Sequence, residues 1–366
     1  MPEDAPFSGP LDALTDVTGI RVGHARLSGE GSLSGTTVVL APVGGAVAAV
    51  DVRGGGPGTR ETDALDPRNL VQRVDAIVLT GGSAYGLDAA SGVTAWLEEQ
   101  GRGVPVGKGP GQVVPVVPAA CLFDLGRGGD WRARPDASTG RAAVEAAAAS
   151  EPGSQVAQGT VGAGTGAVAG ELKGGVGTAS VRLASGVTVA ALAVVNAAGS
   201  VVDPRTGVLY GEYGGARPPV RPAPATHDAA RRRLAAIREA RGDGPFNTTI
   251  AVVATDAALT RAQAQKLAGT AHDGLARAVR PVHLLTDGDT VFTLATGRLP
   301  LPPDTVPALN GILAAGAESL ARAVVKAVRA AHGVEGPGGD FPSYSDLYGD
   351  MDGRRGDTDR EHGDPS

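Results

Sequence analysis

A strand, a glycine turn and a helix follow one another directly in the segment VDAIVLTGGSAYGLDAASGVTAWLEEQG, residues 74–101. Its start is an apolar run typical of a buried strand, and after Gly82 apolar residues recur at helical spacing until Gly101. Earlier β-branched runs bounded by glycine also indicate strands, namely GIRVGHARL at 19–27, GTTVVLAP at 35–42 and GAVAAVDVRGGG at 45–56. Strands mixed with helices in this way predict an α/β fold.

The later segments continue this mixture. The sequence predicts a helix at 136–150, a hairpin at 181–196, a strand at 248–255, a helix at 260–279, two strands around a DGD turn within 280–297, and a helix at 303–332. The glycine-rich stretch 159–180 is expected to form only loops and short edge strands, because glycine weakens longer elements.

Length and composition bound the domain organisation. The chain has 366 residues, 42% of them hydrophobic, which is enough for a large core. Only 3% are aromatic while 56 are glycine, so small side chains and close backbone approach must fill that core. We expect a flexible N-terminus at 1–15, one domain at 16–335 with an exposed Pro-rich linker at about 201–246, and a disordered polar tail at 336–366.

Several classes of function are disfavoured. A net charge of −6 argues against nucleic acid as a partner, and a single Cys121 with scattered histidines argues against a metal site. The glycine-rich GAGTGAVAG at 162–170 has no buried strand before it and carries Ala167 where a dinucleotide-binding loop needs glycine, so no cofactor is expected. The polar N-terminus and the lack of a membrane-length apolar stretch predict a cytoplasmic protein that does not bind membranes.

A different kind of nucleophile is suggested by GDGPFNTTIAVVATDA, residues 242–257. A Gly/Pro-rich approach ends at Asn247, and two threonines open a buried strand. Threonine is a good strand former, so this boundary alone favours a structural role. No G-x-S-x-G motif is present, however, and a threonine freed at a chain N-terminus can use its own α-amino group as the base.

The chain resembles the L-aminopeptidase/D-esterase family of self-processing N-terminal-nucleophile peptidases. The motifs that carry the resemblance run in the family's order over nearly all of residues 16–300, and they include DVRGGGPGTRETDALDP, VLTGGSAYGLDAASGV, VPAACLFDLGRGGD, GELKGGVGTAS, VVNAAGS, NTTIAVVATDAALT and DGDTVFTLATG. Because Asn precedes Thr at this boundary, the chain is similar to the family branch that contains the nylon-oligomer (6-aminohexanoate oligomer) endohydrolases.

The resemblance implies a precursor that cuts itself between Asn247 and Thr248. An α chain of residues 1–247 and a β chain of 248–366 would stay associated, and Thr248 would attack substrate amides. The implied fold is a two-sheet core sandwiched by helices, layered α-β-β-α like other N-terminal-nucleophile hydrolases. The family resemblance also implies a homo-oligomer, a tetramer or larger, of such αβ heterodimers.

Four further site residues follow from the resemblance, each with a structural alternative. Lys173 in ELKGG matches the family's active-site lysine, although a solvated hairpin lysine would look the same. Asn196 in VVNAAGS matches the amide of the oxyanion hole, or else caps its strand. Asp287 and Asp289 in TDGDT match site carboxylates, or else form a turn. The family's oxyanion tyrosine has no match near FDLGRGGDWRARPD, where Trp131 is the nearby ring.

The substrate stays open between two amide classes, with other functions behind them. A pocket for a free amine would give an aminopeptidase/D-esterase on short or β-peptides, and a pocket for an internal amide would give an oligoamide hydrolase. An acyltransferase of the ornithine acetyltransferase type also exposes a threonine. A binding or scaffold protein with a degenerate site would stay a single intact chain, and a nucleotide-binding oxidoreductase would be stabilised by NAD.

Overall fold

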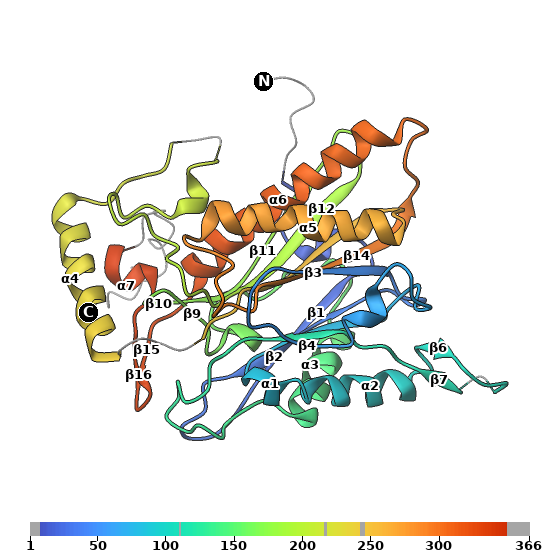
Figure 1. Ribbon diagram of the computed structural model, residues 1–366, viewed down its shortest axis with the longest axis horizontal. Helices are drawn as coiled ribbons and strands as arrows, with labels where there is room; N and C mark the ends of the chain where they lie inside the picture. The colour runs from blue at the N-terminus through green and yellow to red at the C-terminus, as the bar shows by residue number, and fades with distance from the viewer. Residues whose placement is uncertain (1–7, 110, 216–217, 242–245, 350–366) are drawn as a thin grey trace, which may run out of the picture.

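Two five-stranded sheets form the centre of the molecule in a computed structural model that describes residues 8–109, 111–215, 218–241 and 246–349 (Figure 1). The first sheet has the order β1 (Arg21–Arg26), β2 (Gly35–Leu40), β5 (Ala76–Thr80), β8 (Ala119–Cys121), β4 (Gly58–Arg60). The second has the order β11 (Gly175–Arg182), β12 (Thr188–Val195), β13 (Ile250–Ala257), β14 (Thr290–Leu299), β3 (Val47–Val52).

Helices and short hairpins complete the described chain. The helices are α1 (Ser83–Gly86), α2 (Ala89–Glu99), α3 (Ala137–Ala149), α4 (Pro224–Arg241), α5 (Arg261–Ala278), α6 (Thr305–Ala330) and α7 (Tyr344–Tyr348). The short strands pair as β6 (Val104–Pro105) with β7 (Val113–Val114), β9 (Val168–Ala169) with β10 (Leu172–Lys173), and β15 (Val334–Gly336) with β16 (Gly339–Phe341).

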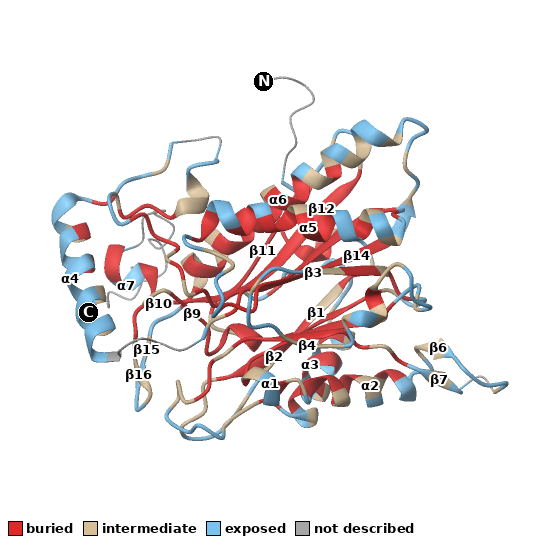
Figure 2. Cartoon of the chain, viewed as in Figure 1, coloured by how far each residue is buried: buried red, intermediate tan, exposed pale blue. Residues whose placement is uncertain are grey.

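The layers are helix, sheet, sheet and helix, as the sequence predicted. Helices α5 and α6 lie over the outer face of the second sheet, and α2 and α3 lie over the outer face of the first (Figure 1). The strand β12 shows why: Val189, Ala191 and Val195 pack in the core toward α5 and α6, whereas Leu192 and Val194 pack between the sheets. Strong burial on both faces appears as continuous red in the central strands of Figure 2.

Glycine lets the helices approach these sheets closely. A Cβ on Gly177 of β11 would lie 2.1 Å from the carbonyl oxygen of Ala323 and 2.3 Å from the nitrogen of Ala327, both in α6. In the first sheet, Gly23 of β1 faces the backbone of α3 in the same way. The expectation of only loops and short edges in 159–180 is therefore wrong for β11, an eight-residue strand whose glycines serve helix packing.

The predicted termini and linker need correction. Residues 336–349 form part of a hairpin and the buried helix α7 rather than a disordered tail, because Tyr344 and Tyr348 pack in the α5–α6 core; residues 350–366 lie outside the described residues. In the N-terminal stretch, Leu14 is buried and Asp12 pairs with Arg322 and Lys326, so 8–15 is fixed by α6; residues 1–7 are not described.

Three other expectations also change. The linker at 201–246 contains the predicted helix, α4, but its start packs into the core through Val201 and Leu209; 216–217 and 242–245 lie outside the described residues. The first of the two strands expected in 280–297 is a loop, and only β14 forms. Among the described residues, one helix, Thr305–Ala330, is long and apolar enough to cross a membrane. Over half of its most apolar window is buried, and the helix contacts β11, β12 and α5, which identifies a core helix.

We predict that Gly177→Ala destabilises the protein, because the new methyl group meets backbone atoms of α6 that cannot turn aside. The expected loss is about 1–3 kcal/mol in the free energy of unfolding, measured by urea denaturation. Gly311→Ala is the matched control: it lies in α6 itself with only Leu183 nearby, at 3.7 Å, and should be neutral or stabilising. Equal losses in both variants would contradict this account of the packing.

Candidate active site

The second sheet gathers the predicted site residues along one edge. Strand β12 runs antiparallel to β13, and β13 runs parallel to β14, with Val194 paired to Ile250 and Ile250 paired to Thr290. The residue after β12 and the residues before β13 and β14 therefore lie at the same end of the sheet. These residues are Asn196, the Asn247–Thr248 pair and the Asp287–Asp289 segment. Lys173 joins them from just before β11, whose Gly175 pairs with Val195.

Thr248 is held with its hydroxyl beside the preceding carbonyl group. Its Oγ1 lies 2.6 Å from the carbonyl oxygen of Asn247 and accepts a hydrogen bond from the Gly288 N–H at 3.1 Å. Its own N–H donates to the carbonyl of Asn196 at 2.5 Å. The side chain is buried, so neighbouring groups fix both the hydroxyl and the peptide nitrogen of this residue.

The carbonyl oxygen of Asn247 also has a backbone donor. The N–H of Gly288 lies 3.2 Å from it, and the N–H of Asn247 donates to the carbonyl of Thr286 at 3.3 Å. A backbone N–H beside the carbonyl that a nucleophile would attack is the kind of group that stabilises an oxyanion. The Gly288 N–H is thus a candidate hydrogen-bond donor to the oxyanion, a role for which the sequence offers no matching tyrosine.

The triple glycine 54–56 fixes the segment that carries this donor. Arg53 and Gly54 donate to the carbonyl of Asp289, and Gly56 donates to the carbonyl of Asp287 at 2.7 Å. A Cβ on Gly54 would lie 2.3 Å from the nitrogen of Asp289, so only glycine allows this backbone contact. The DGD tripeptide is consequently extended along the glycines rather than folded as a turn.

Asn196 is fully buried, and its amide group is fixed in one orientation. Its Oδ1 accepts hydrogen bonds from the Val168 N–H at 3.0 Å and from the Arg127 guanidinium. Its Nδ2 donates to the carbonyl of Phe123 at 3.3 Å. The amide is thus a constrained neutral group at the predicted position, and the main-chain carbonyl of Asn196 accepts from the N–H of Thr248.

Arg127 is a site residue that the sequence analysis did not single out. Its Nη1 donates to Asn196 Oδ1 and to the carbonyl of Gly166, and its Nη2 donates to Asn247 Oδ1 at 2.9 Å. It follows β8 of the first sheet, so it connects the two sheets across the site. Its only sequence signal was its place in the motif LFDLGRGGD, because partners so far away in sequence cannot be read from spacing.

Lys173 is completely buried and makes three hydrogen bonds to the backbone. Its Nζ donates to the carbonyls of Gly164, Ala167 and Gly174, each at 2.9 Å, so it is not the solvated hairpin lysine considered above. Burial, together with the Arg127 guanidinium, lowers the pKa of Lys173 to about 7, and buried Asp124 opposes this shift. Lys173 therefore braces the loop whose Gly166 and Val168 contact Arg127 and Asn196.

The two aspartates hold different parts of the site. Asp287 accepts from the N–H groups of Leu284 and Ala198, at 3.0 and 3.3 Å, and burial followed by the charge of Asp289 raises its pKa. Asp289 accepts from the N–H of Thr249 at 2.7 Å and contacts His283 Nδ1 at 2.8 Å. The contact with His283 could not be anticipated, because the sequence shows this residue only as an isolated histidine.

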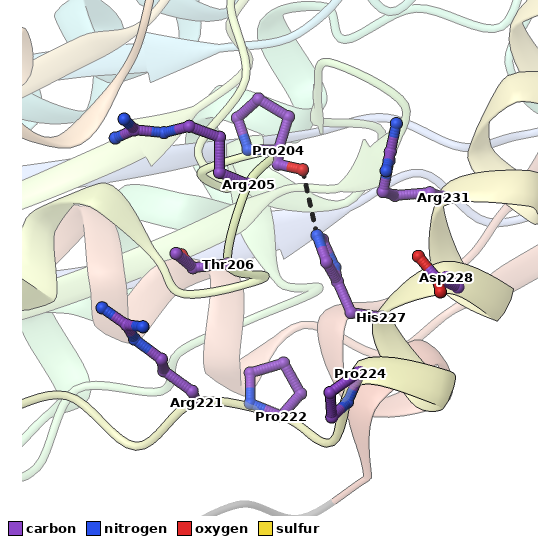
Figure 3. Close-up of a pocket in the computed structure, with 9 residues that line it drawn as sticks. All are labelled: Pro204, Arg205, Thr206, Arg221, Pro222, Pro224, His227, Asp228 and Arg231. Carbon is purple, nitrogen blue, oxygen red and sulfur yellow. Dashed lines mark hydrogen bonds between the residues drawn. The ribbon is translucent and has the colours of Figure 1, made fainter.

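Two described cavities lie elsewhere and contain none of these residues. One of about 530 Å³, between α4 and the loop after Asp203, is lined by Arg205, Arg221, Arg231 and other side chains (Figure 3). Its His227 bonds the Pro204 carbonyl through Nε2 and the Tyr348 hydroxyl through Nδ1, so this histidine fixes the fold. A neighbouring cavity of about 700 Å³ shares His227 and Arg231 with it. Neither cavity offers an activated nucleophile among its lining residues.

A pH dependence of stability follows from buried His272, which stacks edge-on against His283 at 4.8 Å and bonds the Asp51 carbonyl. Burial, with a smaller effect of His283, lowers the pKa of His272 to about 4, whereas an unfolded histidine titrates near 6.5. Between these values the unfolded chain binds a proton that the folded chain does not, so this residue's contribution to stability falls as pH falls from about 6.5 to 4.

We predict that His272→Gln, which keeps a donor for Asp51, weakens this dependence. On acidification the His272 proton should cost the wild-type protein up to about 1.4 kcal/mol of unfolding free energy per pH unit. This part of the loss should disappear in the variant. Urea denaturation at pH 5 and pH 7.5 measures the difference. The same loss of stability in both proteins would show that His272 is not the group that titrates.

Comparison with known proteins places this arrangement in context. The model of peptidase family S58 matches residues 12–341. An uncharacterized aminopeptidase of Mycobacterium tuberculosis is 52% identical over 358 residues, which cover 92% of this chain and 98% of that protein. A 6-aminohexanoate-oligomer endohydrolase of Paenarthrobacter ureafaciens is 32% identical over 296 residues, covering 78% of this chain and 76% of that protein.

Solved structures have the same fold. A β-aminopeptidase of a Burkholderia species aligns with a TM-score of 0.69 and 25% identity over 94% of both chains. The L-aminopeptidase D-Ala-esterase/amidase of Ochrobactrum anthropi, described as a variant of the Ntn hydrolase fold, aligns with a TM-score of 0.68 and 21% identity over 93% of both chains. The predicted fold class is therefore confirmed.

Proposed function

We propose, from the premise that this chain belongs to peptidase family S58, that it cleaves itself between Asn247 and Thr248 and then uses Thr248 as an N-terminal nucleophile. The protein is a peptide or amide hydrolase, as its family and its relatives indicate.

One observation carries the proposal. The Thr248 hydroxyl and the Asn247 carbonyl oxygen lie 2.6 Å apart, and the Gly288 N–H is within 3.2 Å of both oxygens. The hydroxyl donates a hydrogen bond to the carbonyl oxygen of the residue it would attack, so the two reacting groups are already neighbours in one chain and need no diffusional encounter. The next residue, Thr249, also has a buried hydroxyl, but this hydroxyl has no hydrogen-bond partner among the described residues.

Self-cleavage then balances in two steps. Thr248 Oγ1 attacks the carbonyl carbon of Asn247, and the hydroxyl proton passes to the departing nitrogen, which becomes the α-amine of Thr248. The product is an ester between Asn247 and the Thr248 oxygen. Water hydrolyses this ester, leaving a carboxylate on Asn247 and restoring the hydroxyl. The Gly288 N–H is the candidate donor to the negative oxygen of the tetrahedral intermediate.

The mature site repeats this chemistry on substrates. The α-amine of Thr248, beside the Asn196 carbonyl, takes the hydroxyl proton as Oγ1 attacks an amide carbon. The proton then goes to the leaving amine, and water releases the acyl group from the enzyme. Arg127 contributes positive charge and holds the Asn196 amide in place, and Lys173 adds positive charge in its protonated form and braces the neighbouring loop through the Ala167 carbonyl. Asp287 and Asp289 fix the segment around Gly288.

Short peptides and oligoamides are the proposed substrates. Relatives of this chain are named aminopeptidase and 6-aminohexanoate-oligomer endohydrolase, and the backbone carbonyls of Asn196 and Thr286 at the site suit a substrate amine or amide N–H. We further propose a soluble cytoplasmic enzyme built from αβ heterodimers that associate into a homo-oligomer. Size-exclusion chromatography with light scattering measures that assembly directly.

A pair of isosteric variants tests the nucleophile. Thr248→Val removes the hydroxyl that contacts the Asn247 carbonyl group, and should leave one intact chain with no amidase activity. Thr249→Val makes the same change one residue later, at a hydroxyl without a partner, and should still be cleaved. Intact-mass spectrometry after purification reads both results. Cleavage of the Thr248→Val protein after Asn247 would remove Thr248 from its proposed role.

A further inference from the structure

The two residues before the proposed cleavage point have side-chain contacts from one loop of the first sheet, residues 122–131. The ring of Phe246 lies 5.9 Å from that of Phe123, which in turn meets Trp131 edge-on at 6.0 Å. Arg127, from the same loop, donates through Nη2 to Asn247 Oδ1 at 2.9 Å. This loop therefore contacts the acyl side of the peptide bond at both positions.

The guanidinium of Arg127 is fixed by groups other than Asn247. Nη1 bonds the Gly166 carbonyl at 2.8 Å and Asn196 Oδ1, and both partners belong to the second sheet's edge and its neighbouring loop. Because the guanidinium is planar and rigid, these bonds also set the direction in which Nη2 points. Nη2 therefore points at the side chain of the residue whose carbonyl group Thr248 attacks.

The uncleaved peptide is the first amide that Thr248 attacks in the proposed function, on which this inference rests. Later substrates must place their carbonyl carbon against the same Oγ1 and the same Gly288 N–H, so their acyl residue lies where Asn247 lies. We propose that Arg127 is the specificity-determining residue of an acyl subsite. The subsite takes residues whose side chain carries a carboxamide or carboxylate at the position of the asparagine group.

Backbone contacts at the subsite fit both a terminal and an internal acyl residue. The N–H of Asn247 donates to the carbonyl of Thr286 at 3.3 Å, and a free α-amine could donate to the same oxygen. In longer substrates, an apolar or aromatic residue in the place of Phe246 would lie against Phe123 and Trp131, both of which have partly or largely exposed rings.

The test compares two substrates of nearly equal shape, L-asparagine p-nitroanilide and L-leucine p-nitroanilide, on the purified and fully processed enzyme. A hydrogen bond to a charged group corresponds to roughly a tenfold or larger difference, so kcat/KM should favour asparagine by about that factor. Arg127→Met should reduce the ratio to near one. Arg132→Met, an exposed arginine of the adjoining segment, is the matched control and should keep the wild-type ratio.

The outcomes separate this inference from the function beneath it. Hydrolysis of both substrates with no preference in the wild type, or an unchanged ratio in Arg127→Met, would overturn the subsite and leave amide hydrolysis standing. A wild-type chain that stays uncleaved and turns over no amide at all would instead contradict the proposed function. Retention of part of the preference in Arg127→Lys is expected, because lysine keeps a charge but loses the planar geometry.

A second measurement applies if the Arg127→Met protein fails to process or fold. In this measurement Arg127 is unchanged, and the substitution is made at Asn247, the acyl residue of the peptide bond that the chain itself cleaves. Asn247→Leu removes the acceptor and should slow self-cleavage by about tenfold or more, whereas Asn247→Asp keeps an acceptor for the guanidinium and should cleave near the wild-type rate. Timed intact-mass spectra give the rates. Equally fast cleavage of the leucine variant would show that Arg127 does not read this side chain.

Discussion

The pairing of β13 with an antiparallel neighbour on one side and a parallel neighbour on the other is the constraint on which the site depends. It brings the end of β12 and the beginnings of β13 and β14 to one edge of the second sheet. Asn196, Thr248 and Asp287 come from segments separated by dozens of residues, yet each lies at most three residues from its strand. Ladder hydrogen bonds deep in the core thus set the distances between these three residues, which suits the proposed catalytic role.

The first sheet completes this edge through a single charged residue. Arg127 links the loop after β8 to Asn196 and to Asn247, and its charge is one reason that Lys173 has a lowered pKa. A buried Lys173 so near the partly buried guanidinium of Arg127 requires compensation, which buried Asp124 and the carbonyls around Lys173 and Arg127 supply. The polar interior of the site is therefore one connected network that spans both sheets.

Much of this architecture could be predicted from the sequence because it rests on local patterns. Continuous apolar runs predicted β12 and β13, helical spacing predicted α5 and α6, and the family motifs pointed to Lys173, Asn196 and the aspartates, whose chemical roles remain predictions. Glycine accounts for the main error in the predicted fold. At Gly177 it lets strand β11 approach helix α6 closely, whereas a glycine-rich sequence is usually interpreted as a loop. The packing of α7 likewise depends on a core formed by distant helices. Arg127 and the Gly288 N–H contact residues that are distant in the sequence, so no spacing reveals these contacts. His283 contacts Asp289 only six residues away, but through a loop whose conformation the sequence does not show.

The central claim is that the chain cuts itself after Asn247. Intact-mass spectrometry of the purified wild-type protein, with N-terminal sequencing of the smaller fragment, tests it most directly. The account predicts two fragments that stay associated, the smaller beginning Thr-Thr-Ile. A single chain of 36.4 kDa that persists for days, or a fragment beginning at any other residue, would contradict it.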